Sequence, residues 1–359
     1  MKNSSARKFW TLFTLVILAA MLLTACGGGA TPAPTQEPAA EEQAPAEQPE
    51  EPAASGEPFR VAVVMPSQIN DLAFSQSMYA TLQAKQEELG AENFEFVYTD
   101  NMFVVEDAAA AIRDYASKGY DLIIAHGSQY GSSLVEIAPD FPETSFAHGT
   151  TVDTFVEQGI TNVFAYEARS EQGGFVNGVI AAMLSESNTI GVVGPIETGD
   201  AKLYVDGFRA GVLSVKPDAQ VNVNWIGSFS DVALASEAAQ THINAGADAM
   251  TGSAQMVVGA VGVANDNGVP WFGTQYNQTS LAPEIVVASQ VYKWEVVLDQ
   301  IMDLIAEGTL GGQAFQIDLA NGGEAIEFNP DFELSEDILQ AAQDTITGIS
   351  EGTIEIELP

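Results

Sequence analysis

Aromatic and polar residues are concentrated directly after the predicted strands of this chain of 359 residues. Phe74 and Phe229 lie in two such segments, near Asp71 and Asp231 respectively. A phenyl ring can stack on a planar heterocycle, and a carboxylate can accept hydrogen bonds from its N–H groups. Segments of this kind after the strands of a parallel sheet predict binding of a small molecule. The aspartates have a competing role, because Asp also caps helix N-termini.

Further candidate ligand contacts carry hydroxyl, amide, imidazole or phenol groups, which donate and accept hydrogen bonds. They are Ser75, His126, Ser128, His148, Ser253, Gln255, Gln275, Asn277, Gln290 and Tyr292. The histidines lie apart and lack metal-ligand spacing, so we expect no metal site. The sequence also lacks a GxSxG elbow, a phosphate-binding loop and a dinucleotide fingerprint. We therefore expect a binding protein that is no enzyme and uses no cofactor.

Short apolar runs alternate with longer amphipathic ones from residue 59 onward. The predicted strands are 60–65, 94–98, 122–126, 145–148, 162–166, 189–193, 221–226, 249–252, 271–273, 285–289, 314–318 and 352–357. The predicted helices are 74–89, 105–118, 171–184, 201–215, 232–245, 256–266, 294–307 and 336–346. Strands rich in Val and Ile that alternate with helices predict an α/β fold of parallel sheets covered on both faces.

Two similar phrases suggest two similar lobes. Lys118-Gly119-Tyr120-Asp121-Leu122 and Ala245-Gly246-Ala247-Asp248-Ala249 each end a predicted helix and begin a strand. We expect residues 59–163 with roughly 274–300 in one doubly wound lobe, and 164–273 with roughly 301–359 in the other. Ligands of open parallel sheets bind at the carboxyl ends of the strands. The candidate residues would then face a shared cleft between hinged lobes.

The N-terminus predicts export. Basic residues at positions 2, 7 and 8 precede an apolar run, residues 9–23, which is too short to span a bilayer comfortably. Leu23-Thr24-Ala25-Cys26 resembles a bacterial lipobox, which implies a signal peptide over 1–25 and a lipid on Cys26 at the extracytoplasmic face of the cell membrane. An ordinary signal peptide with a chance cysteine is the alternative. Residues 26–58, rich in Pro, Ala and Glu, predict a disordered tether.

The charge balance bears on partners. The chain has 49 acidic and 12 basic residues, a formal net charge of −37. Nucleic acid and anionic lipid surfaces both require a basic footprint, so we expect neither as a partner. An acidic surface is typical of soluble extracellular proteins.

Several motifs together resemble the BMP (basic membrane protein) lipoproteins, a family that includes purine nucleoside receptors of ABC importers. The resemblance runs from about residue 59 to 312 and depends on the order and spacing of the motifs. The matching segments are 70–77, 120–124, 141–147, 171–178, 191–194, 207–211 and 227–231. The resemblance implies a type I periplasmic-binding-protein fold with three hinge crossovers, a permease partner in the membrane and a monomer. It also implies that Phe74 and Phe229 sandwich a purine-like base.

The sequence departs from the family where the sugar of a nucleoside would sit. Gln275 replaces an Asp, Tyr292 stands where the family has a Lys, and Ser75 replaces an Asn. The acid expected near residues 148–150 is missing as well. Charge-assisted contacts to hydroxyls are thereby lost, which favours a bare nucleobase or another neutral polar heterocycle over a nucleoside. A ligand sensor for a signalling receptor and a nucleoside hydrolase are the alternative functions.

Overall fold

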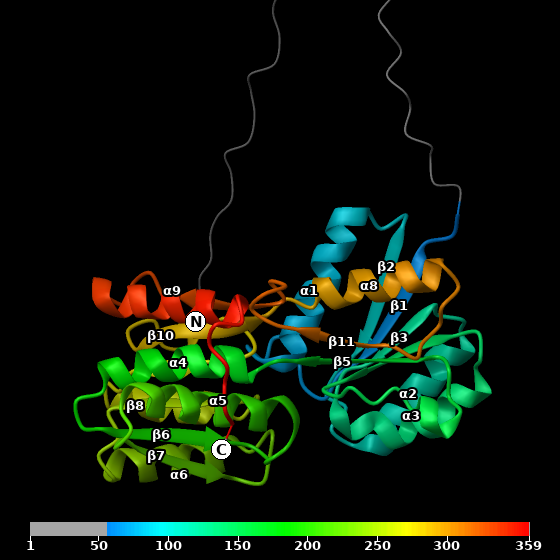
Figure 1. Cartoon of the computed structure of the whole chain (residues 1–359). Helices are drawn as coiled ribbons and strands as arrows, with labels where there is room; N and C mark the ends of the chain where they lie inside the picture. Colours follow the sequence, from blue (N-terminus) through cyan, green and yellow to red (C-terminus); the bar gives the residue numbers. More distant parts are fainter. Residues whose placement is uncertain (1–55, 359) are drawn as a thin grey trace, which may run out of the picture. The chain divides into compact units, whose positions relative to one another are not determined.

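The computed structural model describes residues 56–358 of the chain (Figure 1). The predicted signal peptide over 1–25, Cys26 and most of the predicted tether lie outside the described residues. Between residues 56 and 358, no helix has the length and apolar character needed to cross a membrane.

The first sheet has six parallel strands in the order β11-β5-β4-β3-β1-β2. These are β1 (Phe59–Val64), β2 (Phe94–Thr99), β3 (Leu122–Ala125), β4 (Ser145–Gly149), β5 (Val163–Ala168) and β11 (Ala314–Ile317). Helices α1 (Phe74–Leu89) and α8 (Glu295–Ala306) share one apolar cluster with the sheet, and α2 (Val105–Ser117) and α3 (Gly131–Ile137) share another. The central strands are therefore apolar on both faces, as β1 illustrates with Val61–Val64 fully buried.

The second sheet has the order β12-β10-β9-β8-β6-β7. Its strands are β6 (Thr189–Gly194), β7 (Gln220–Trp225), β8 (Ala249–Gly252), β9 (Trp271–Gly273), β10 (Val286–Tyr292) and β12 (Glu324–Phe328), the last antiparallel to β10. Helices α4 (Glu171–Leu184), α5 (Gly199–Val215) and α9 (Glu336–Ser350) share one apolar cluster with this sheet. Helices α6 (Val232–Asn244) and α7 (Val257–Asp266) share the other. Two parallel-sheet α/β lobes result, as the sequence predicts.

The chain passes between the two sheets three times (Figure 1). The first crossover joins β5 to α4, the second joins β10 to α8, and the third joins β11 to β12. The sequence-based division differs from this arrangement in three places. One is β11, which lies in the range 301–359 assigned to the second lobe but pairs with β5 in the first sheet. The boundary at residue 163 falls at the start of β5, which pairs in the first sheet, and β10, assigned to the first lobe, pairs in the second. Because β10 is buried on both faces, its sequence has no alternation to indicate a partner sheet.

The structure also differs from the sequence-based expectation at three further elements. Helix α3 follows a histidine-glycine strand end and is too short to show periodicity, and β12 has a Gly pair before it, so neither was predicted. Residues 352–357, predicted as a strand, form no strand in the structure. Gly352 has a left-handed φ of 71°, which is incompatible with an extended strand. Ile354 and Ile356 instead pack on the α9 cluster without strand pairing.

Helices α4 and α5 pack closely because glycines lie at their contact. A Cβ on Gly178 would lie 2.2 Å from the carbonyl oxygen of Phe208, and one on Gly211 would lie 2.1 Å from that of Phe175. Both obstacles are backbone atoms of the opposite helix, which a side-chain movement cannot relieve. This contact fixes the position of α5 and hence of the loop before it.

We predict that Gly178→Ala lowers the free energy of unfolding by about 1–3 kcal/mol, because the two helices must separate to admit the methyl group. Gly262→Ala is the matched control, since a Cβ on this α7 glycine has no neighbour within 4 Å. It should leave stability unchanged or raise it by up to about 1 kcal/mol. Urea denaturation followed by circular dichroism measures both. Equal effects of the two substitutions would contradict the close helix contact.

Candidate ligand-binding site

A cavity that is partly open to solvent lies where the carboxyl ends of strands from both sheets meet. Its lining residues follow β1 to β4 in the first sheet and β6 to β9 in the second. They are Pro66, Phe74, Phe103, Gly127, Ser128, Gln129, Thr150, Thr198, Gly199, Asp200, Ala201, Phe229, Ala254, Gln255 and Gln275.

Phe74 lines the cavity at the start of α1 and is held by His126. The imidazole stacks on the phenyl ring with centroids 3.8 Å apart and planes 4° from parallel. His126 Nε2 donates to the carbonyl oxygen of Phe74 at 3.0 Å, and Nδ1 accepts from the hydroxyl of Tyr166 at 2.6 Å. Because the carbonyl can only accept, the proton lies on Nε2. With one face covered by His126, Phe74 can offer a ligand only its other face.

His126 was predicted to contact ligand, and the structure places it behind Phe74 instead. Both of its ring nitrogens have protein partners, and it is fully buried. Burial lowers the pKa of His126 to about 3. The imidazole is therefore neutral at physiological pH and acts as a support for the stacking ring.

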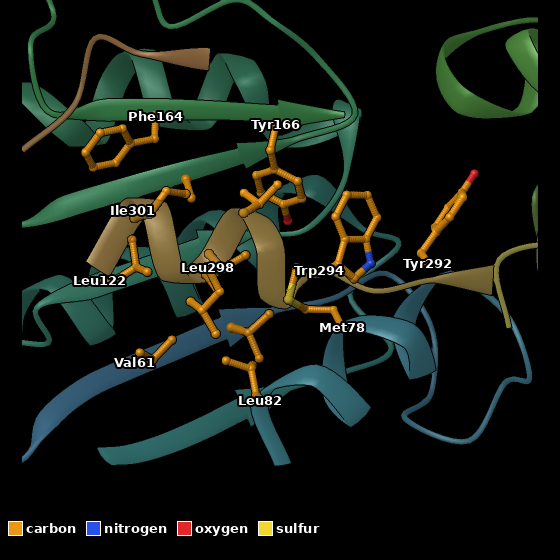
Figure 2. Packing of buried hydrophobic residues seen from close by; sticks show 14 of the residues in the cluster. Val61, Met78, Leu82, Leu122, Phe164, Tyr166, Tyr292, Trp294, Leu298 and Ile301 are labelled. Atoms are coloured by element: carbon orange, nitrogen blue, oxygen red, sulfur yellow. The ribbon is translucent and has the colours of Figure 1, made fainter. Parts of the chain in front are cut away.

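Trp294 packs nearly perpendicular to both of these rings, and Figure 2 shows it between Tyr166 and Tyr292. Its ring meets those of Phe74, His126, Tyr166 and Tyr292 edge-on, at centroid distances of 5.1 to 6.2 Å. The indole N–H donates to Ser77 Oγ at 2.9 Å. Trp294 directly follows β10 at the second crossover, so the hinge and the stacking ring share one packed cluster.

Two more aromatic side chains line the cavity from loops. Phe229 follows β7 in the second lobe and is half-buried, and Phe103 follows β2 in the first lobe and is 38% exposed. Phe229 was predicted from the sequence. Phe103 was missed, although it too follows a strand and the polar residues Thr99, Asp100 and Asn101 precede it.

Four polar oxygens of the lining have no hydrogen-bond partner within the described residues. They belong to Gln255, Gln275 and Asp200, and Asp200 contributes both carboxylate oxygens. Burial, together with the negative charges of Glu167 and Glu171, raises the pKa of Asp200 well above its usual range. Asp200 was not predicted. It follows the strand over 189–193, as the other lining residues follow their strands, but its residue type and neighbours do not distinguish it from the other acidic residues of the chain.

The backbone around the cavity adopts uncommon conformations. Thr150, Ala254 and Gln275 all line it with left-handed φ angles of 62°, 72° and 69°. Non-glycine residues rarely adopt these angles, and such residues cluster at ligand sites, where the surrounding fold maintains them. At Gln275 the left-handed conformation turns the chain back toward β10. The backbone N–H of Tyr292 in β10 donates to the carbonyl of Gln275 at 3.2 Å.

Several predicted contacts do not line the cavity because they serve local structure. Asp71 accepts the backbone N–H groups of Ala73, Ser75 and Gln76 at 2.9 to 3.2 Å, and so caps α1. Asp231 accepts the N–H of Leu234 at 3.0 Å and caps α6. The hydroxyl of Ser75 accepts the N–H of Ser67. For both aspartates the capping alternative describes the structure.

Three further predicted residues lie beside the lining. His148 is buried, reaches the carbonyl of Ser128 at 3.4 Å and stacks on Phe155. Ser253 is buried directly before the lining pair Ala254 and Gln255. Asn277 donates to a carboxylate oxygen of Glu327 at 2.7 Å. Thus Phe74, Ser128, Phe229, Gln255 and Gln275 are the predicted residues that the structure brings together around the cavity.

Gln290 and Tyr292 connect the crossovers. The hydroxyl of Tyr292 bonds with that of Ser170 at 2.6 Å, and the amide of Gln290 donates to the Ser170 carbonyl at 3.0 Å and to Glu324. Glu324 also accepts the N–H of Gly173 at 2.7 Å. Burial raises the pKa of Glu324 well above its usual range. Side chains from all three crossovers thus form one buried polar network at the hinge.

Contact between the lobes also occurs directly beside the stacking ring. The amide of Gln278, which follows β9, donates to the carbonyl of Leu72 at 3.2 Å, two residues before Phe74. Across residues 56–358, no group of three or more His, Cys, Asp or Glu side chains is arranged to hold a metal ion.

Comparison with known proteins places these features in a family. Residues 59–357 match the Bmp family, described as PnrA-like ABC transporter substrate-binding proteins. The purine-binding protein of Brucella abortus is 27% identical over 76% of this chain and 76% of its own length. A putative ABC transporter glucose-binding protein of Haloferax volcanii is 26% identical over 84% of this chain and 74% of its own. A solute-binding protein structure from Aeropyrum pernix matches with a TM-score of 0.70 at 20% identity, covering 84% of this chain and 94% of that one.

The pH dependence of stability tests the buried, neutral state of His126. A folded-state pKa near 3, against about 6.5 unfolded, means that the unfolded chain binds the proton first as the pH falls. The contribution of neutral His126 is complete above about pH 6.5 and is lost toward pH 3. Between about pH 7 and about pH 4.5, His126→Gln should therefore lose roughly 2–3 kcal/mol less unfolding free energy than the wild type.

Urea titrations at each pH measure this difference, and only the slopes are compared, because the substitution also changes packing. His242→Gln is a control at a second buried histidine. Burial lowers the pKa of His242 as well. Equal pH slopes for the wild type and His126→Gln would contradict the buried neutral imidazole.

Proposed function

This chain belongs to the family of PnrA-like ABC transporter substrate-binding proteins, and from that premise we propose that it captures a purine-like nucleobase or nucleoside as a lipid-anchored receptor. Proteins of this family act outside the cytoplasm and deliver a small molecule to a membrane permease. Binding is the whole of the proposed activity. The ATPase that drives import would be another chain.

The single observation that carries this proposal is the pair of rings at the cavity. Phe74 from the first lobe and Phe229 from the second both line it, and Phe74 has one face available. Stacking of a base on an aromatic side chain contributes about 1–3 kcal/mol. The unpartnered oxygens of Gln255 and Gln275 supply acceptors for ring N–H groups. A flat heterocycle with N–H donors satisfies both sets of groups.

The surroundings of the predicted sugar position favour the free base within this proposal. Gln275 lines the cavity, and the hydroxyl of Tyr292 already bonds to Ser170. Lys293 is exposed and does not replace the family's ammonium group at the cavity. Neutral groups form weaker hydrogen bonds to sugar hydroxyls than charged ones do. A ribose would therefore gain less here than in a nucleoside receptor.

Ligand binding would shift the lobes toward the arrangement in which both contact the ligand. Contacts from Phe74 and Phe229 to one molecule exist only when the lobes approach, so the ligand's differential affinity drives the shift. The three crossovers supply the hinge. A permease that recognises this arrangement would take up ligand from loaded receptors and ignore empty ones.

A panel of ligands tests the proposal, with thermal unfolding of the full chain in detergent as the measurement. At one hundred times its dissociation constant, a ligand adds about 2.7 kcal/mol of stability. For a chain of this size, the midpoint should rise by roughly 2 °C or more. We expect shifts with free purine bases, smaller ones with nucleosides and none with glucose. A shift with glucose alone would favour a sugar receptor, as the Haloferax relative is named.

The stacking residue on the second lobe gives the sharper test. Phe229→Ala should weaken binding of the best purine at least about tenfold, the loss expected from one stacked ring. Phe229 is preferable to Phe74, which is 6% exposed and part of the core, so that its truncation would also cost about 3–5 kcal/mol of stability. Phe332→Ala, at a partly buried ring away from the cavity, is the control. Unchanged affinity in Phe229→Ala would reject the sandwich.

The anchor is tested separately through Cys26. Wild-type chain should sediment with membranes and incorporate labelled palmitate. Cys26→Ser should incorporate no palmitate, because the thioether-linked lipid cannot form without the thiol. An ordinary signal peptide with a chance cysteine would leave both proteins unlabelled.

A further inference from the structure

Asp200 is the one ionisable side chain among the residues that line the cavity. It lies in the first turn of α5, directly after the loop that follows β6, and is 4% exposed. Neither carboxylate oxygen has a hydrogen-bond partner within the described residues. A buried carboxyl group without hydrogen-bond partners is costly because it has lost its hydration, and the nearby backbone N–H groups of Ala168 and Asp200 offset only part of that cost. A ligand that supplies N–H groups would remove this cost.

Basic side chains near this loop are engaged elsewhere. Lys202 pairs with Asp206, one turn further along α5, and Arg169 pairs with Glu171 at the first crossover. Glu167 and Glu171 add negative charge near Asp200. The field at this end of the cavity is therefore negative and repels anions, including phosphorylated compounds.

We propose that Asp200 determines ligand specificity by accepting a hydrogen bond from an exocyclic amino group of the heterocycle held between Phe74 and Phe229. The inference rests on the proposed function, because it assumes a stacked heterocyclic ligand. Asp200 distinguishes an amino-bearing ring from the same ring without the amino group. Such a site rejects a ligand that lacks the donor, because the carboxyl group then stays buried and unpaired.

The two oxygens of the carboxyl group allow a paired contact. In the acid form, which burial favours, one oxygen donates and the other accepts. This complements an amino group adjacent to a ring nitrogen, the arrangement along one edge of adenine. Asparagine has the same donor and acceptor on atoms of similar position, whereas alanine has neither.

Binding of two matched pairs of bases tests the role of Asp200. Adenine and unsubstituted purine differ by one amino group, as do guanine and hypoxanthine. Equilibrium competition against the best-bound base, with full-length protein in detergent, gives the affinity ratio within each pair. In the wild type, the amino-bearing member of the pair that contains the best ligand should bind at least about tenfold tighter, as expected for one buried hydrogen bond.

Three variants complete the experiment. Asp200→Ala should reduce that ratio to about one while retaining the base without the amino group, and it should unfold at a higher temperature, because an unpaired buried group is removed. Asp200→Asn should keep most of the ratio. Glu197→Ala, which removes an exposed acid from the same loop, should match the wild type.

The outcomes separate this inference from the proposed function. If the wild type binds purines and Asp200→Ala leaves the ratio unchanged, the inference is wrong and the function stands. A lower unfolding temperature in Asp200→Ala with an unchanged ratio would assign Asp200 a purely structural role. If no base binds the wild type, both proposals are overturned.

Discussion

The stack of His126 on Phe74 is the interaction on which the rest of the site depends. A fully buried imidazole must find partners for both nitrogens, and here the Phe74 carbonyl and the Tyr166 hydroxyl supply them. These two bonds fix the tautomer and the plane of the ring, and the plane of Phe74 follows at 4°. One neutral side chain thus orients the surface on which the proposed base would stack, without contacting the ligand itself.

The same cluster connects the stacking ring to the hinge. Trp294 contacts both His126 and Phe74 and lies at the second crossover, beside Tyr292, whose hydroxyl bonds to Ser170 at the first. Glu324 joins the third crossover to this network. A change in the relative orientation of the lobes would therefore shift the position of Phe74 through the aromatic rings packed against it. On the other side of the cavity, the glycines between α4 and α5 hold the loop that carries Asp200.

Sequence patterns could predict the fold and five of the fifteen residues that line the cavity, and the failures have physical causes. Phe74 and Phe229 were identified because the family resemblance implies a stacking ring at each position, and both line the cavity. Residue type alone could not separate ligand contacts from caps, and Asp71 and Asp231, which were predicted as ligand contacts, cap helices instead. His126 follows a strand as a ligand contact would, and only its hydrogen bonds in three dimensions show its supporting role.

The residues missed from the sequence lacked a local signature. Asp200 is one acid among 49, and its importance comes from burial without a partner, which depends on packing between elements far apart in the chain. β10 could complete either sheet, since strands buried on both faces carry no alternation. The sheet in which such a strand pairs depends on where the chain crosses between the lobes. The short loops that connect the strands carry no sequence signal for the position of these crossovers.

A crystal structure of the protein grown with its tightest-binding purine tests the central claim most directly. The account predicts the base in the cavity with its plane parallel to Phe74 and Phe229, each ring centroid within about 4.5–7 Å of it, and His126 still stacked behind Phe74. A purine bound elsewhere, or held in the cavity with its plane facing neither ring, would contradict it.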